Sequence, residues 1–217
     1  MATKQKIGDA NRARMSKVIE LLKREYPEAQ CSLLYKNPYE LLIATMLSAQ
    51  CTDERVNQVT PVLFKKFPDA HAMAKATQAQ IEAIIRTTGF FRSKAKGILE
   101  TSKRLASEFG GKVPADLDTL VTLRGVGRKT ANVVLGNAFN TPGMVVDTHV
   151  GRISRRLGFT YHTDPEKVEQ ELMLLVPRDT WTIYSHWLID HGRAVCSART
   201  LPKCEACVLA PYCPKKF

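Results

Sequence analysis

Apolar residues along this chain recur at the spacing of α-helices, and no segment alternates for long with the two-residue period of a strand. The first helical face ends before Pro27 and is formed by Met15, Val18, Ile19 and Leu22. A second helix is predicted to begin at Asn37-Pro38 and to continue through an apolar body at residues 41–47. Because this body is apolar nearly all round, we expect it to be central to a core.

Helix start and stop signals delimit the elements that follow. Thr52-Asp-Glu54 is typical of a helix start, and Thr77-x-x-Gln80 has the residues of a capping box. A longer helix is predicted over residues 90–109, and Gly110-Gly111 ends it. Later helices are expected from Asp147 to Leu157 and over residues 165–175 and 177–194. The fold class predicted from this pattern is all-α.

A glycine-containing hairpin, Leu123-Arg-Gly-Val-Gly-Arg-Lys-Thr-Ala-Asn132, joins two short predicted helices. Apolar residues at helical spacing precede it at Leu117, Leu120 and Val121, and follow it at Ala131, Val134, Leu135 and Ala138. Gly125 and Gly127 allow a positive φ and the close approach of another backbone. The free amides at the start of the second helix, its positive dipole end and Arg128 together favour phosphate. We interpret the segment as a helix-hairpin-helix that binds a DNA backbone without reading its sequence.

Lys129, in the first turn of the second helix, is the candidate nucleophile. The helix dipole disfavours an ammonium ion there, and loss of solvent would further favour the neutral amine. Downstream, Asp147 ends the short apolar run Val145-Val146, with His149 placed to orient it. A carboxylate near a lysine can orient it, accept a proton or stabilise a developing cation. For each residue alone a simpler interpretation is open, in which Lys129 only contacts phosphate and Asp147 only caps a helix.

Charge narrows the class of partner. The 217 residues carry 32 lysines and arginines against 21 aspartates and glutamates, so the formal net charge is 32 − 21 = +11. A polyanion is the simplest partner, and an anionic membrane is the weaker alternative. With no apolar run near about 18 residues and no signal-peptide pattern, we expect a cytoplasmic protein without a membrane partner. Motifs for nucleotide-driven or acyl-transfer chemistry are also missing from the sequence.

Four of the six cysteines gather near the C-terminus: Cys196, Cys204, Cys207 and Cys213. Disulfides are not expected in a chain without a secretion signal, so thiolate ligation of a metal is the better interpretation. Zinc commonly uses two C-x-x-C pairs, whereas this chain has one, which also suits an iron–sulfur cluster. The spacing alone leaves zinc and iron–sulfur open. The other two cysteines, Cys31 and Cys51, are expected to be inert.

Two loops outside the hairpin are candidates for DNA contact, namely Ser48-Ala-Gln50 and Gly89-Phe-Phe-Arg-Ser-Lys94. An enzyme acting on one base must unstack it and fill the space that it leaves. Gln50 is a candidate to fill that space, and Phe90 to wedge into the opposite strand. Arg92 is a further candidate for DNA contact. In the alternative interpretation Phe90 and Phe91 are core residues, which is favoured for one of the two.

The stretches LRGVGRKTANVVLGNAF and VVDTHVGRISRRLG resemble the endonuclease III family of DNA glycosylases. The similarity runs from about Asn37 to the C-terminus. In that family a hairpin lysine and a following aspartate form the catalytic pair, and these correspond to Lys129 and Asp147 without gaps. The resemblance also implies an intercalating glutamine at Gln50 and an apolar wedge at Phe90.

The resemblance implies that the four C-terminal cysteines bind a [4Fe–4S] cluster and not zinc. One departure is present, because the usual family spacing is C-x6-C-x2-C-x5-C and here seven residues, Ser197 to Lys203, fill the first gap. An extra residue in a surface loop is tolerable but leaves the stability of the cluster open. The implied architecture has two helical domains with a cleft between them. A six-helix domain over residues 31–141 carries the hairpin, and residues 1–30 with 142–217 form the cluster domain.

The implied activity is base excision repair of duplex DNA by a monomer. Oxidised pyrimidines would be removed by an N-glycosylase step, with Lys129 on one wall of the cleft and Asp147 on the other. The strand would then be cleaved 3′ to the abasic site by β-elimination through a lysine Schiff base. Three alternatives are a monofunctional adenine glycosylase, whose relatives lack the hairpin lysine, a DNA-binding module without catalysis, and a zinc-bound scaffold.

Overall fold

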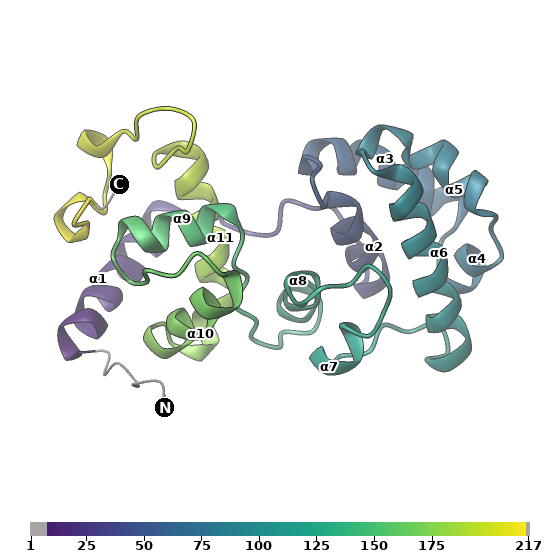
Figure 1. Ribbon diagram of the computed structural model, residues 1–217, viewed down its shortest axis with the longest axis horizontal. Helices are drawn as coiled ribbons and strands as arrows, with labels where there is room; N and C mark the ends of the chain where they lie inside the picture. The colour runs from purple at the N-terminus through teal and green to yellow at the C-terminus, as the bar shows by residue number, and fades with distance from the viewer. Residues whose placement is uncertain (1–7, 216–217) are drawn as a thin grey trace. The chain divides into compact units, whose positions relative to one another are not determined.

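The computed structural model describes residues 8–215, and each regular element within that range is a helix, so the all-α prediction is confirmed (Figure 1). The α-helices are α1 (Asp9–Glu25), α2 (Pro38–Ser48), α3 (Asp53–Lys66), α4 (Ala70–Ala74), α5 (Gln78–Ile85), α6 (Phe91–Glu108), α7 (Leu117–Leu120), α8 (Arg128–Ala138), α9 (Thr148–Arg156), α10 (Pro165–Leu175) and α11 (Trp181–Ala194). Short 3-10 turns are η1 (Arg86–Thr88), η2 (Arg178–Thr180), η3 (Cys204–Ala206) and η4 (Ala210–Tyr212).

Local capping chemistry sets several of these boundaries as the sequence predicts. Asn37 and Thr52 accept hydrogen bonds from backbone amides at the starts of α2 and α3, and Thr77 with Gln80 forms the complete capping box of α5. Two elements differ from the prediction. The last long helix begins at Trp181, because the residues before it form η2. The five-residue helix α4 is missed, since so short a segment shows no apolar periodicity.

Contacts divide the chain into two compact units, Cys31–Thr141 and Met1–Gln30 with Pro142–Phe217. We call the first the hairpin unit and the second the cysteine unit, and each has its own hydrophobic core. The described part of the cysteine unit excludes residues 1–7 and 216–217.

The hairpin unit is built around α2, as its all-round apolar sequence predicts. Residues 39–47 of this helix are all buried. Helices α3, α6 and α8 pack against it, and α4 and α5 pack on the outer part of α6 (Figure 1). Burial of apolar surface on every side of one helix fixes the elements that carry the hairpin.

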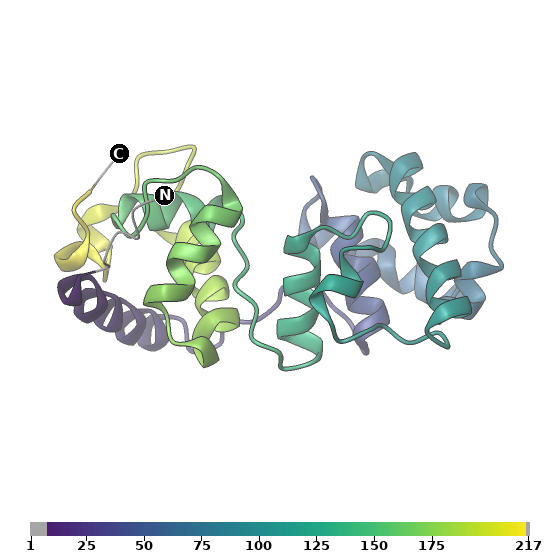
Figure 2. The ribbon, with the colours of Figure 1, turned by 60° about the horizontal axis from the view of Figure 1, so that its bottom comes forward.

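The cysteine unit brings together the two ends of the described chain. Helix α1 buries Met15, Val18 and Leu22 and packs against α10, α11 and η4 (Figure 2). The Arg14 guanidinium lies 4.1 Å from the centre of the Phe159 ring, and its Nη1 donates to the Tyr212 carbonyl at 3.0 Å. The N-terminal helix is therefore bound directly to the C-terminal cysteine loop. Across the described range, no helix is both long and apolar enough to cross a membrane.

Truncation in the core of α2 should destabilise the hairpin unit far more than truncation on its surface. Leu42 is fully buried, so Leu42→Ala is expected to lower the free energy of unfolding by about 2–5 kcal/mol through lost apolar contacts and a cavity. The control is Val62→Ala on α3, where the side chain is 58% exposed and the expected change is about 0.5 kcal/mol or less. Denaturant unfolding followed by circular dichroism measures both, and equal losses would contradict the central position of α2.

Candidate active site and metal centre

The turn of the hairpin (residues 123–127) is tight and held by its apolar residues. Leu123 and Val126 are buried in the core of the hairpin unit, and the Val126 amide donates to the Leu123 carbonyl at 3.1 Å. The residues between and after them, Arg124, Gly125 and Gly127, are exposed. The alternation of apolar and small residues thus anchors the turn and leaves its backbone facing outward.

Helix α6 supports the hairpin through hydrogen bonds to its backbone. Thr101 Oγ1 donates to the Arg124 carbonyl at 2.8 Å. Arg124 also pairs with Glu100 at 3.0 Å, but both side chains are substantially exposed, and such surface pairs contribute little. The contact from the buried Thr101 is the stronger constraint, because breaking it would leave a buried hydroxyl without its hydrogen bond.

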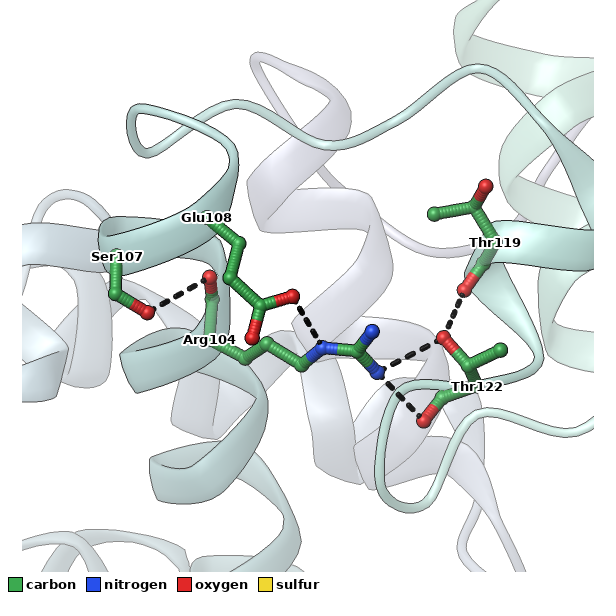
Figure 3. Close-up of polar contacts among 5 residues, drawn as sticks. All are labelled: Arg104, Ser107, Glu108, Thr119 and Thr122. Carbon is green, nitrogen blue, oxygen red and sulfur yellow. Dashed lines mark hydrogen bonds and ion pairs between the residues drawn. The ribbon is translucent and has the colours of Figure 1, made fainter.

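One helical turn further along α6, Arg104 holds the segment that leads into the hairpin (Figure 3). Its Nη1 donates to both the carbonyl and the hydroxyl of Thr122, at 3.0 and 2.8 Å, while its Nε donates to Glu108 at 2.8 Å. The Thr122 hydroxyl donates in turn to the Thr119 carbonyl at 2.7 Å, at the end of α7. These contacts fix the entry to the hairpin on the same face of α6.

The two hairpin glycines differ in their backbone conformation and surroundings. Gly125 has a φ of +78°, in the left-handed region, and a Cβ there would lie 3.1 Å from Met46 Cε. Gly127 has a φ of −90°, which other residues adopt readily, and a Cβ there would meet nothing within 4 Å. The expectation of positive φ therefore holds for Gly125 alone. The open space at Gly127 leaves only the second expectation, room for an approaching backbone.

Helix α8 begins with an uncapped N-terminus. Gly127 is its N-cap residue and offers no side chain to accept from the first-turn amides. The start of α7, by contrast, is capped by Asp116, which accepts from the Thr119 amide at 2.8 Å. Arg128 and Lys129 follow Gly127 and are both exposed. Outward amides, the positive dipole end and two cations make this helix start suited to an external anion.

Asp147 has a structural role in addition to any chemical one. Its Oδ1 accepts from the Val150 amide at 2.8 Å and caps α9, as the simpler interpretation of this residue predicts. The carboxylate is half-buried and follows the buried residues 144–146. The cap uses Oδ1 and fixes the orientation of the side chain.

Helix α9 links the Asp147 turn to the first cysteine of the C-terminal loop. Arg152 Nη2 lies 3.2 Å from His149 Nδ1 and donates to the Cys196 carbonyl at 2.9 Å. Burial lowers the pKa of the Arg152 guanidinium, and the nearby charges of Cys196 and Asp147 raise it. Lys129 belongs to the hairpin unit and Asp147 to the cysteine unit, and each is placed only within its own unit.

The candidate intercalating residues Gln50 and Phe90 stand at exposed turns of the hairpin unit. Both have left-handed backbones, with φ of 54° and 46°, and the Phe90 side chain is 67% exposed. They line the same cavity of about 260 Å³, which also reaches Gly125. Phe91 instead packs partly against the core, with the Arg92 guanidinium 5.6 Å from its ring. Of the two adjacent phenylalanines, Phe91 is therefore the one that closes the loop.

The four C-terminal cysteines line one cavity of the cysteine unit. Its other lining residues are Ile153, Arg156, Leu157, His191, Val195, Pro202 and Leu209. No cysteine among the described residues forms a disulfide, and within that range no three His, Cys, Asp or Glu side chains converge on a single ion. Four cysteines that surround a shared space could supply the ligands of a metal centre.

Two side chains of the cysteine unit reach the sulfur atoms. Arg156 Nη1 donates to Cys196 Sγ at 3.1 Å, which suits a thiolate. His191 lies between Tyr26 and Cys207, with its Nδ1 3.0 Å from the Tyr26 hydroxyl and its Nε2 3.6 Å from Cys207 Sγ. Burial lowers the pKa of His191 to about 4 and raises the pKa of the Cys207 thiol. The raised pKa favours the protonated form of Cys207, so the Arg156 hydrogen bond and the four cysteines around one cavity are the observations that fit a metal-bound thiolate set.

Sequence motifs do not reveal the contacts of several supporting residues: Thr101 and Arg104 lie outside the motifs, and Arg156 lies within VVDTHVGRISRRLG. Arg104, Thr101 and Arg156 each make contacts that span at least 18 positions along the chain. Periodicity places each of them on a helix, but only the folded chain shows which backbone group it meets.

Comparisons with known proteins agree with this geometry. The description "HhH-GPD superfamily base excision DNA repair protein" matches residues 43–178. An endonuclease III from Synechocystis sp. is 52% identical over 206 residues, covering 94% of each chain. A solved non-covalent endonuclease III–DNA complex has a TM-score of 0.89 and 41% identity, covering 94% of this chain and 95% of the other. A trapped endonuclease III–DNA covalent intermediate, an estranged-adenine complex, has the same TM-score and identity and covers 94% and 96%.

Adding a methyl group should destabilise the protein at Gly125 and have little effect at Gly127. Gly125→Ala forces a Cβ into a left-handed backbone beside Met46, so the free energy of unfolding should fall by about 1–2 kcal/mol. Gly127→Ala, the matched control, meets open space at an extended backbone and should change it by about 0.5 kcal/mol or less. Thermal unfolding distinguishes the two variants. A larger loss for Gly127→Ala would overturn the assigned geometry.

Proposed function

The chain belongs to the endonuclease III family within the HhH-GPD superfamily of base excision DNA repair proteins, and we propose that Lys129 and Asp147 perform its chemistry. The protein is a bifunctional DNA glycosylase and abasic-site lyase. It removes oxidised pyrimidines from duplex DNA and then cleaves the strand 3′ to the abasic site. We further assign its action to a monomer in the cytoplasm, on the nucleoid.

The observation that carries the assignment of Lys129 is its place at the start of α8. The uncapped amides and Gly127 give a phosphate a binding position, and Lys129 follows in the first turn with an exposed side chain. A backbone phosphate held there brings the adjoining sugar near the amine. Contacts of this kind position the duplex without reading its sequence. Covering by DNA removes water from the lysine and favours the neutral, nucleophilic amine.

The glycosylase step begins with attack of the Lys129 amine on the sugar C1′. A C–N bond forms as the bond between C1′ and the base breaks, and the base leaves with that electron pair and takes up a proton. Asp147 holds one oxygen in the cap of α9 and uses the other to accept a proton or stabilise the cationic sugar. Both side chains must reach the same nucleotide, and this convergence of the two units is part of the proposal.

The lyase step uses the covalent intermediate. The bond between C1′ and the ring oxygen O4′ breaks, O4′ takes up a proton, and the lysine nitrogen forms a double bond to C1′. The resulting protonated Schiff base withdraws electrons from C2′. A proton is lost from C2′, and the 3′ phosphate departs by β-elimination. Hydrolysis of the Schiff base then releases Lys129.

Extrusion of the damaged base is assigned to Gln50, which fills the vacated space, and Phe90, which wedges into the opposite strand. Arg92 contacts the DNA from the same loop.

The four cysteines are assigned to a [4Fe–4S] cluster. Cys196, Cys204, Cys207 and Cys213 line one cavity, and Arg156 donates to the first of these sulfurs. When bound, the cluster supplies a covalent cross-link that shapes the C-terminal loop. Lys203 and Lys215 are exposed in that loop, where they can contact phosphate. The seven-residue first gap lies in a surface loop and is compatible with this ligand set.

Borohydride trapping tests the nucleophile. On a duplex with one thymine glycol, the wild type should give a covalent protein–DNA band and Lys129→Ala should give none, because reduction of the Schiff base joins this lysine to the sugar. The control is Lys112→Ala, an exposed lysine of the hairpin unit outside the hairpin, which should trap as the wild type does. Equal trapping by Lys129→Ala would assign another amine. Release of free base without trapping would make the protein monofunctional, and binding alone would make it a non-catalytic module.

Optical spectra of the purified protein test the cluster. The wild type should be brown with broad visible absorption, and the Cys204→Ser variant should lose much of that colour because one thiolate ligand is removed. Cys51→Ser, a cysteine of the hairpin unit, should retain it. A colourless wild-type protein that contains zinc would contradict the assignment.

A further inference from the structure

We propose that Lys94 is a positioning residue for base extrusion, because its buried amine joins the two turns that carry Gln50 and Phe90. This inference deepens the proposed function and rests on it. Lys94 lies in the first turns of α6, and its side chain is 91% buried, with a relative exposure of 9%. The sequence places it in a candidate DNA-contacting loop, but its burial assigns it a different task.

The Lys94 ammonium group makes two short hydrogen bonds to backbone carbonyls. Its Nζ donates to the Leu47 carbonyl at 2.7 Å and to the Thr88 carbonyl at 2.6 Å. Leu47 stands in the last turn of α2, and Thr88 is the last residue of η1. Carbonyls at helix C-termini lack intrahelical donors and carry the negative end of the dipole, so a buried cation is well placed there. One side chain of α6 thereby joins two other elements.

Each of these carbonyls lies just before one of the candidate intercalating residues. Gln50 follows Leu47 by three positions, and Phe90 follows Thr88 by two. Both have left-handed backbones, a strained conformation that persists only where the surroundings hold it. Gly89, the residue before Phe90, also has a positive φ, and a Cβ there would lie 3.9 Å from the Gln50 carbonyl oxygen. The two turns are therefore neighbours in space.

The same lysine lines the cavity between the two turns. This cavity of about 260 Å³ is bounded by Gln50, Phe90, Lys94 and Gly125 among others. Burial lowers the pKa of Lys94, and the neighbouring Cys51 thiol raises it. The side chains of Gln50 and Phe90 are exposed, while the Lys94 amine that holds the backbone of their turns is buried. The residues that would enter the DNA are therefore distinct from the residue that supports them.

Fixing both turns in advance matters for one step of the reaction. Unstacking a base requires Gln50 and Phe90 to enter the duplex together, and disordered tips would first have to be ordered at an entropic cost. Phosphate binding at α8 and attack by Lys129 use other residues. Loss of the Lys94 amine should therefore slow base release from a paired lesion and spare β-elimination at an abasic site that has no base to extrude.

The test compares single-turnover rates of Lys94→Met on two duplexes. One duplex contains thymine glycol paired with adenine, and the other contains a preformed abasic site. Methionine keeps the unbranched apolar stem and removes the amine. Base release should fall about tenfold or more, while β-elimination stays within about twofold of the wild type. A 2-aminopurine beside the lesion reports unstacking directly, and its fluorescence rise should slow by the same factor as base release.

Lys103→Met is the matched control, because Lys103 is an exposed residue of the same helix and its loss removes the same charge. It should leave both rates unchanged. If Lys94→Met lowers both rates equally or neither, the inference is overturned. If the wild type shows no trapping or base release, the proposed function itself fails.

A second variant tests the same proposal in case Lys94→Met does not fold. Lys94→Arg keeps the charge and the donors, but its larger planar head must displace the two carbonyls. It should show the same split, with slower base release and near-normal β-elimination, to a smaller degree. An equal effect on both rates, or no effect on either, would again contradict the positioning role.

Discussion

The attachment of the hairpin to α6 is the constraint on which the candidate site depends. A helix start that binds an external phosphate must leave its amides outward and uncapped, so the chain has to hold the turn from behind. Thr101 and Arg104 do this through backbone contacts at Arg124 and Thr122, and Gly125 allows the turn to lie close against Met46. Contacts at Thr122, Arg124 and Gly125 thus hold the turn, and Gly127 at the start of α8 faces open space.

Only one of the two candidate catalytic residues, Asp147, also caps a helix. Lys129 stands exposed on α8, whereas Asp147 caps α9 with one of its two oxygens. A carboxylate fixed by a helix cap has a defined orientation, which favours its use in catalysis. The two interpretations of Asp147, helix cap and catalytic carboxylate, are therefore compatible. Arg152 likewise makes two contacts, since it connects His149 to the backbone of Cys196.

Buried or half-buried cations hold together segments that are distant in the sequence in both units. Lys94 joins the ends of α2 and η1, and Arg14 joins α1 to the C-terminal loop. In each case the cation meets backbone carbonyls and no carboxylate. The high positive charge of the chain thus has two uses, since some cations face outward for a polyanion while others complete the backbone hydrogen bonding inside.

The sequence by itself determined the local features: the helical periods, the caps at Thr52 and Thr77, the glycine turn before Lys129 and the grouping of four cysteines. These depend on neighbouring residues, so a single stretch contains the whole signal. Tertiary structure decided which phenylalanine is exposed, that only Gly125 needs a left-handed backbone, and that Lys94 and Arg104 support turns elsewhere in the chain. Such outcomes depend on which distant backbone groups meet a side chain, and hydrophobic periodicity carries no information about those partners.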